Sequence, residues 1–111
     1  MKRLNKEALD ILYDILYNIR KDFPHTRFTW KYNFMLEDYC LMYDMVPKGY
    51  NQYTFENEVS KKYITPEIAT KFMDITDVWI CIYYDNDNCI DFSDDIEEVE
   101  IVVKRYKHNK K

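Results

Sequence analysis

Apolar and polar positions repeat along the chain with two different periods, and each period predicts a kind of element. Between residues 4 and 21 the apolar side chains recur at helical spacing and leave a narrow polar strip. Asn5 stands where an N-cap is needed, with Leu4 and Leu9 spaced as a hydrophobic staple. Pro24 ends the pattern. We therefore expect a long, heavily buried helix here.

The period changes to two in residues 27–34, which predicts a half-buried strand. Its alternating rings are Phe28, Trp30, Tyr32 and Phe34. A second strand is expected in residues 38–46, before Pro47 and Gly49 interrupt the pattern. A third, less regular strand is expected in residues 53–60, where Tyr53, Phe55 and Val59 share one parity.

The second half of the chain begins with a short helix in residues 65–75, where Thr65 supplies the cap and Pro66 the first turn. A hairpin then follows, with a three-residue loop at 86–88. This register places apolar side chains on one face: Val78, Ile80, Ile82, Tyr84, Ile90 and Phe92. Residues 97–106 are β-branched and favour a last strand, with a helix as the alternative.

These elements predict an α+β fold. We expect a mainly antiparallel sheet of about five to six strands, with the long N-terminal helix on one face and a short second helix. The chain has 111 residues, which suits one core. Residues 1–103 are expected to form a single domain, and residues 104–111 a basic, frayed tail.

Charge is strongly segregated along the chain, although the net charge is only −4. Residues 72–103 contain ten carboxylates and no lysine or arginine, and residues 104–111 contain five bases and no acid. Such a base-free acidic block predicts a field that accelerates docking onto a cationic protein.

Metal and catalytic motifs do not account for this block. Counted from Asp85 as an EF-hand loop, the glycine position is Ile90 and the bidentate glutamate position is Ile96, so the pattern fails. Gly49 is the single glycine, which excludes P-loop and dinucleotide-binding fingerprints. A Cys40 nucleophile would have only His25 or His108 as its base. We expect no metal, no cofactor and no enzymatic activity.

Cysteine usage and hydropathy indicate a cytoplasmic protein. No apolar run reaches the roughly 20 residues of a membrane helix, and the N-terminus has no signal-peptide core. Cys40, Cys81 and Cys89 are an odd number in strand-like segments, which favours reduced core thiols over a disulfide framework.

Eleven tyrosines are more than one small core buries, and surface tyrosines are preferred anchors at protein interfaces. The alternative is that they simply surround the core with their hydroxyls in water. Together with the acidic block, they predict a face that binds a basic protein partner. The candidate partner-binding residues are Tyr83, Asp85, Asp87, Asp91, Asp94, Asp95, Glu97 and Glu98.

The order of elements resembles that of the small α+β immunity proteins with which bacteria neutralise secreted toxins. The features that carry the resemblance are the leading amphipathic helix, the aromatic strands "RFTWKY" and "YCLMYDMV" ending in "PKG", and the segment "CIDFSDD". The resemblance implies an inhibitor that blocks the basic groove of a toxin or nuclease with acidic residues. Small phage inhibitors of host defence nucleases share this chemistry.

Two other functions remain open at this stage. The basic tail and the aromatic strands are also compatible with binding to nucleic acid. A small enzyme without a local motif would need a pocket that gathers His25, Cys40 or several carboxylates. The sequence does not fix the oligomeric state, and a homodimer through the first helix is one arrangement.

Overall fold

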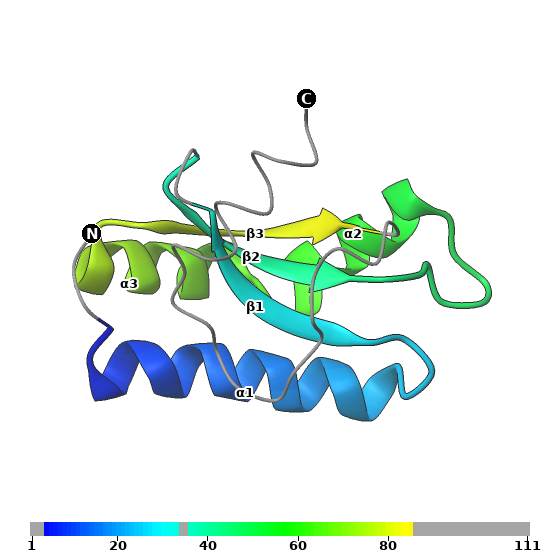
Figure 1. The fold of residues 1–111 in the computed structure, drawn as a ribbon, viewed down its shortest axis with the longest axis horizontal. Coiled ribbons are helices and arrows are strands. Elements are labelled where there is room, and N and C mark those ends of the chain that lie inside the picture. Colours follow the sequence, from blue (N-terminus) through cyan, green and yellow to red (C-terminus); the bar gives the residue numbers. More distant parts are fainter. Residues whose placement is uncertain (1–3, 34–35, 86–111) are drawn as a thin grey trace.

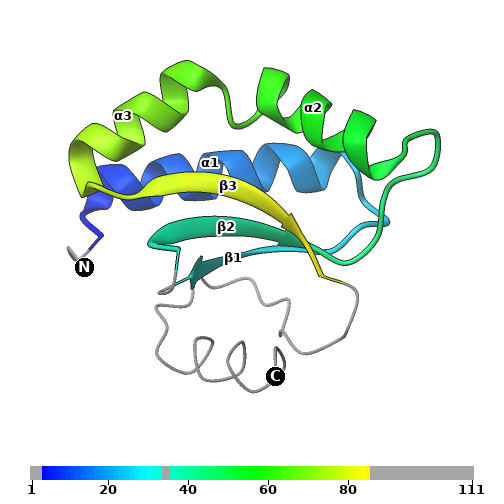
Figure 2. The ribbon, with the colours of Figure 1, turned by 90° about the horizontal axis from the view of Figure 1, so that it is seen from above.

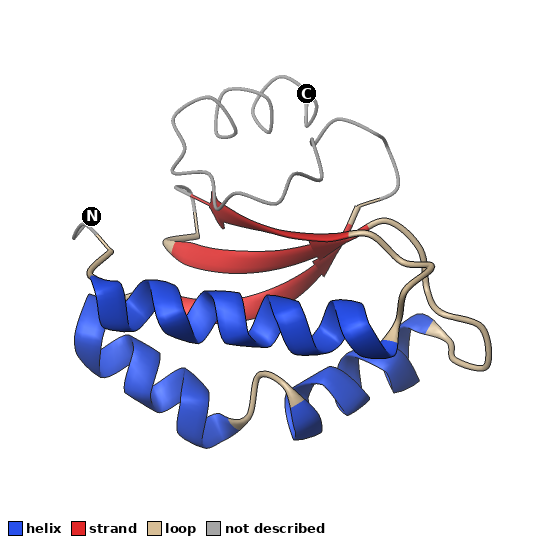
Figure 3. Cartoon of the chain, turned by 90° about the horizontal axis from the view of Figure 1, so that it is seen from below, coloured by secondary structure: helices blue, strands red, loops and turns tan. Residues whose placement is uncertain are grey.

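The computed structural model describes residues 4–33 and 36–85 (Figure 1). In this part of the chain the three helices pack together on one face of a three-stranded sheet (Figures 2 and 3). The elements are α1 Lys6–Asp22, β1 Phe28–Asn33, β2 Asp38–Tyr43, α2 Gln52–Lys62, α3 Pro66–Thr76 and β3 Trp79–Tyr84.

Helix α1 is the element that the periodicity predicted. The side chain of Asn5 accepts a hydrogen bond from the backbone N–H of Ala8 at 2.9 Å, so the expected N-cap is confirmed. The helix ends at Asp22, just before Pro24. It is less buried than expected, because Leu9 and Ile11 are only partly covered. Its fully buried face consists of Ala8, Leu12, Ile15, Leu16 and Ile19.

The expected strand in residues 53–60 is wrong, because this segment lies in helix α2. Asn51 and Thr54 form a reciprocal capping box, with the Asn51 side chain 2.8 Å from the Thr54 backbone nitrogen. Phe55 and Val59 are both buried, and residues four apart share a helix face as well as a strand parity. The parity of Phe55 and Val59 therefore does not distinguish a strand from a helix here, whereas the capping box of Asn51 and Thr54 identifies a helix.

Helix α3 confirms the short helix predicted after residue 64. Thr65 caps it by accepting a hydrogen bond from the Ile68 N–H at 3.3 Å, and Pro66 occupies the first turn. Asp77 ends the helix in the left-handed conformation, with φ of 60°. The chain then enters β3 directly.

The expected sheet of five to six mainly antiparallel strands is wrong. The described residues form one mixed sheet in the order β1-β2-β3, in which β1 pairs antiparallel with β2 and β2 pairs parallel with β3. Parallel neighbours need a long crossover, and α2 and α3 supply it. The predicted strands near residues 90 and 100 lie outside the described residues.

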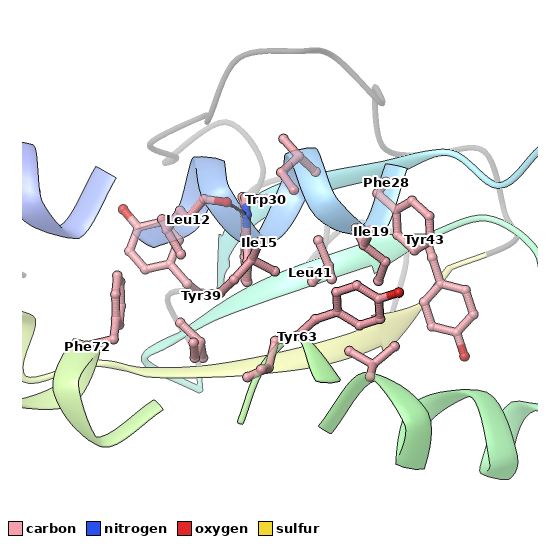
Figure 4. Close-up of a cluster of buried hydrophobic side chains, with 14 of the residues drawn as sticks. Leu12, Ile15, Ile19, Phe28, Trp30, Tyr39, Leu41, Tyr43, Tyr63 and Phe72 are labelled. Atoms are coloured by element: carbon pink, nitrogen blue, oxygen red, sulfur yellow. Dashed lines mark hydrogen bonds between the residues drawn. The ribbon is translucent and has the colours of Figure 1, made fainter. Parts of the chain in front are cut away.

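The main core lies between the helices and the sheet face that we call the first face (Figure 4). Every second strand residue contributes to the first face: Phe28, Trp30, Tyr32, Tyr39, Leu41, Tyr43, Ile80, Ile82 and Tyr84. Trp30 is fully buried, and its Nε1–H donates to the backbone oxygen of Leu12 at 2.7 Å. This bond satisfies the indole donor and ties β1 to α1.

Strand β1 is buried along its whole length, although a half-buried strand was predicted. Its polar residues Thr29, Lys31 and Asn33 alternate with the core rings, so they point to the opposite side of the sheet. Lys31 is nevertheless 0% exposed. Polarity correctly assigned these residues to one side of the strand but did not predict their burial.

Candidate partner-binding face

The side of the sheet opposite the described helices, which we call the second face, is defined by the strand register. Three rows of side chains cross it from β1 to β3. The rows are Asn33, Asp38 and Trp79; Lys31, Cys40 and Cys81; and Thr29, Met42 and Tyr83. The second face therefore combines charged and polar side chains with sulfur and two aromatic rings, whereas the first face is aliphatic and aromatic.

The middle row brings two cysteines together. The sulfur atoms of Cys40 and Cys81 are 3.3 Å apart, and neither residue belongs to a disulfide. Cys40 is 1% exposed, as expected of a core cysteine, whereas Cys81 is half-buried. The hydrogen bond with Cys40 lowers the pKa of the Cys81 thiol, against the opposing effects of burial and of Asp38.

Two of the predicted partner-binding residues lie in the described part of the chain. Tyr83 is half-buried on the second face, beside Met42 and Cys81. Asp85 follows the end of β3, and its backbone N–H donates to the carbonyl of Tyr43 at 2.9 Å. Asp85 is only 8% exposed, so little of its surface is accessible. The other six candidates, Asp87, Asp91, Asp94, Asp95, Glu97 and Glu98, lie outside the described residues.

A group of mostly exposed acidic and apolar residues lies at the opposite end of β3, where that strand begins beside the start of β2. We call it the Trp79 patch, and it consists of Leu36, Glu37, Asp38, Asp77 and Trp79. Trp79 is 52% exposed and pairs in register with Asp38. Leu36, Glu37 and Asp77 are also exposed.

Two acids of this patch adopt the left-handed backbone conformation. Glu37 and Asp77 both have positive φ, 55° and 60°, and Asp tolerates this conformation better than most residues. Burial, and then the neighbouring Glu37 carboxylate, raise the pKa of Asp38. The same two acids, after burial, raise the pKa of Tyr32 on β1. The patch thus holds its negative charge at some cost in stability.

Sequence reasoning missed Trp79 and Leu36 as surface groups. The signal for Trp79 was available, because the predicted core face of β3 consists of even-numbered residues and Trp79 has odd parity. Leu36 gave no such signal, since it stands in a connection without periodicity.

The described residues also contain a small pocket where the three helices meet, with a volume of about 200 Å³. Its lining is Ile11, Asp14, Ile15, Asn18, Lys62, Tyr63, Ile68 and Lys71. Sites for small molecules usually measure about 300–1,000 Å³, so this one suits at most a single side chain. The nearby bond from the Tyr63 hydroxyl to Asp22 links α2 to α1 and has a structural role.

Residues 4–33 and 36–85 contain neither a metal-binding cluster of side chains nor a membrane-spanning helix. Within those ranges no three His, Cys, Asp or Glu side chains gather in a way that would hold a metal ion. Over the same ranges, no helix is long and apolar enough to cross a bilayer.

Comparisons with protein families, with curated proteins and with solved structures find no match to this chain. The face must therefore be interpreted from its own chemistry.

Proposed function

We propose that the protein is a non-enzymatic inhibitor that binds and neutralises a basic protein partner, of the toxin or nuclease class. The observation that carries this proposal is the exposed side chain of Trp79, a residue that pairs in register with Asp38 and follows Asp77 by two positions. An indole left in water beside carboxylates offers a cationic protein both an anchor and complementary charge.

The chemistry of interfaces supports this assignment. Tryptophan and tyrosine are enriched among the residues whose truncation costs most binding energy, and charged groups around them set association rate and specificity. Asp38 adds a second argument, because burial and Glu37 raise its pKa. An ionised carboxylate that disfavours the folded state is more readily explained by binding than by stability.

The sequence extends the same chemistry along the chain. Asp74 and Asp77 are the first of ten carboxylates in residues 72–103, a stretch without lysine or arginine. The partner-binding residues proposed from the sequence, from Tyr83 to Glu98, follow Trp79 along the chain. Under this proposal the Trp79 patch supplies the anchor and the acidic block supplies the steering field.

The nucleic-acid alternative loses one of its two supports. The rings of Phe28, Trp30 and Tyr32 are buried in the core, so they are not available to stack on bases. What remains is the basic tail, which lies outside the described residues.

The proposal is tested by affinity capture from native lysate in low salt, with and without nuclease, comparing three baits. The baits are the natural chain, Trp79→Ala and, as a matched control, Tyr53→Ala, which removes another exposed ring on α2 that is 75% accessible. We expect the natural chain to capture a cationic protein in stoichiometric amount, with or without nuclease. Trp79→Ala should bind this protein at least tenfold more weakly, and Tyr53→Ala should bind it as well as the natural chain does.

Asp38→Asn and Asp77→Asn separately test how much the two carboxylates contribute to the rate of association with the partner. Both should slow association in low salt and have little effect in high salt, because screening removes steering between exposed charges. Equal capture by all baits would reject the Trp79 patch. Capture of material that nuclease destroys would instead identify nucleic acid as the ligand.

A further inference from the structure

We infer that Cys40 and Cys81 form a redox modification site, at which a small disulfide such as oxidised glutathione converts the two thiols into a reversible cross-link between β2 and β3. This inference is independent of the proposed function. It rests on the second face of the sheet, where the two sulfur atoms already touch.

The geometry requires little movement. The sulfur atoms are 3.3 Å apart, and Cys40 and Cys81 are direct partners in the parallel register. Neighbouring strands lie about 4.8 Å apart, inside the range of about 4.4–6.8 Å between Cα atoms that disulfides occupy. Side chains that are paired in register point to the same face, so both sulfur atoms are on the same side of the sheet.

The two thiols differ in a way that assigns them different roles. Cys81 is half-buried and therefore reachable, whereas Cys40 is 1% exposed. Cys81 is also the thiol whose pKa is lowered, mainly by its hydrogen bond with Cys40. A thiolate is the attacking species in thiol–disulfide exchange. Cys81 is thus the attacking residue, and Cys40 is the resolving residue.

The reaction has two balanced steps. The Cys81 thiolate attacks one sulfur of oxidised glutathione, which forms a mixed disulfide and releases one glutathione thiolate. The Cys40 thiol then loses its proton to solvent, and its sulfur attacks the Cys81 sulfur and expels the second glutathione thiolate. The two cysteines are oxidised by two electrons in total, and one glutathione disulfide is reduced to two thiols.

The surroundings favour a cross-link over a persistent mixed disulfide. Met42 is fully buried beside Cys40, and the partly buried Tyr83 lies beside Cys81, so a bulky glutathione adduct has little room. The resolving sulfur, in contrast, is already in contact. The cross-link would join positions 41 residues apart and close a loop that contains α2 and α3.

The test uses the full chain carrying Cys89→Ser, which removes the third cysteine. The folded protein is equilibrated with a series of glutathione redox buffers, quenched in acid, and measured by intact mass and by peptide mapping. We expect the loss of two hydrogen atoms, a Cys40–Cys81 peptide, and a midpoint of thermal unfolding raised by several degrees. Reduction should reverse all three.

Two single variants in the same background separate the roles. Cys40→Ser should accumulate one glutathione on Cys81 and gain no thermal stability. Cys81→Ser should react much more slowly while folded, because the remaining thiol is inaccessible. The inference is overturned if the parent retains glutathione without a cross-link, if it forms covalent dimers, or if it reacts only after urea unfolds it.

Discussion

The two faces of the sheet are built from the same strands but have different tasks. The first face is hydrocarbon and aromatic, and three helices cover it. The second face carries Lys31 and the Cys40–Cys81 pair, and Trp79 stands at its end. The difference shows that the alternation within each strand separates a side of apolar and aromatic core residues from a side that carries polar side chains and the two thiols.

The largest expected difference between the faces concerns the two tryptophans of the chain. Trp30→Ala should lower the free energy of unfolding by about 3–5 kcal/mol, because it leaves a cavity and removes the bond to Leu12. Trp79→Ala should change it by about 0.5 kcal/mol or less, since more than half of the ring is already in water. Urea titration of both variants measures the two changes in the free energy of unfolding. Losses of similar size would contradict the expected difference between the two tryptophans.

Alkaline pH should produce the next effect, through two tyrosines of the main core, Tyr43 on the first face and Tyr63 at the end of α2. Burial, and then hydrogen bonds to Glu56 and Asp22, raise the pKa values of Tyr43 and Tyr63. Their stabilising contribution is complete below the unfolded value of about 10 and is lost as the pH rises through the folded values. Thermal unfolding should therefore show a decline above about pH 10. Tyr43→Phe and Tyr63→Phe should each make the unfolding temperature fall less steeply with pH. An unchanged dependence on pH would show that the ionisation of these tyrosines does not cause the decline.

A smaller effect should come from the cap of α2. Asn51→Ala removes the capping box with Thr54 and should cost about 1 kcal/mol. Asn57→Ala, an exposed position in the same helix, is the matched control and should cost nothing. Hydrogen exchange should show faster opening of α2 in the first variant, while the thiol reactivity of Cys81 stays the same. If Asn51→Ala also changed the thiol reactivity of Cys81, opening of α2 on the first face would be coupled to the second face.

The smallest expected effect is a gain in stability, in contrast to the losses above. Because burial and Glu37 raise the pKa of Asp38, its ionisation at neutral pH disfavours the folded state. The contribution of Asp38 is fully favourable only below its unfolded value of about 4 and is lost as the pH rises through the folded value. Asp38→Asn should thus stabilise the protein at pH 7 by about 0.5 kcal/mol or less, with no gain in acid. Destabilisation at pH 7 would show that Asp38 has a structural role.

Local signals in the sequence predicted α1, α3 and the core sides of β1 and β3. Asn5 and Thr65 are caps that depend on neighbours three residues away, and the even-numbered core residues of β3 follow from a period of two. Such features require no knowledge of distant residues, which is why they were predictable.

The topology and the second face depend on distant residues, and the sequence did not reveal them. Parallel pairing of β2 with β3 follows from α2 being a helix, and the parity of Phe55 and Val59 fitted either structure. The burial of Lys31 was hidden, because alternation reports only polarity. The contact between Cys40 and Cys81 needs the strand register, which no spacing of cysteines contains.

The crossover that makes β2 and β3 parallel also orders the events of folding. Strands β1 and β2 are close in sequence and can pair early, whereas β3 must wait until both helices of the crossover have closed a long loop. Among the described strands, the one that docks last carries both Trp79 and Cys81. A partner held by the indole, or a bond formed by the sulfur, would therefore stabilise the docking of β3 against β2.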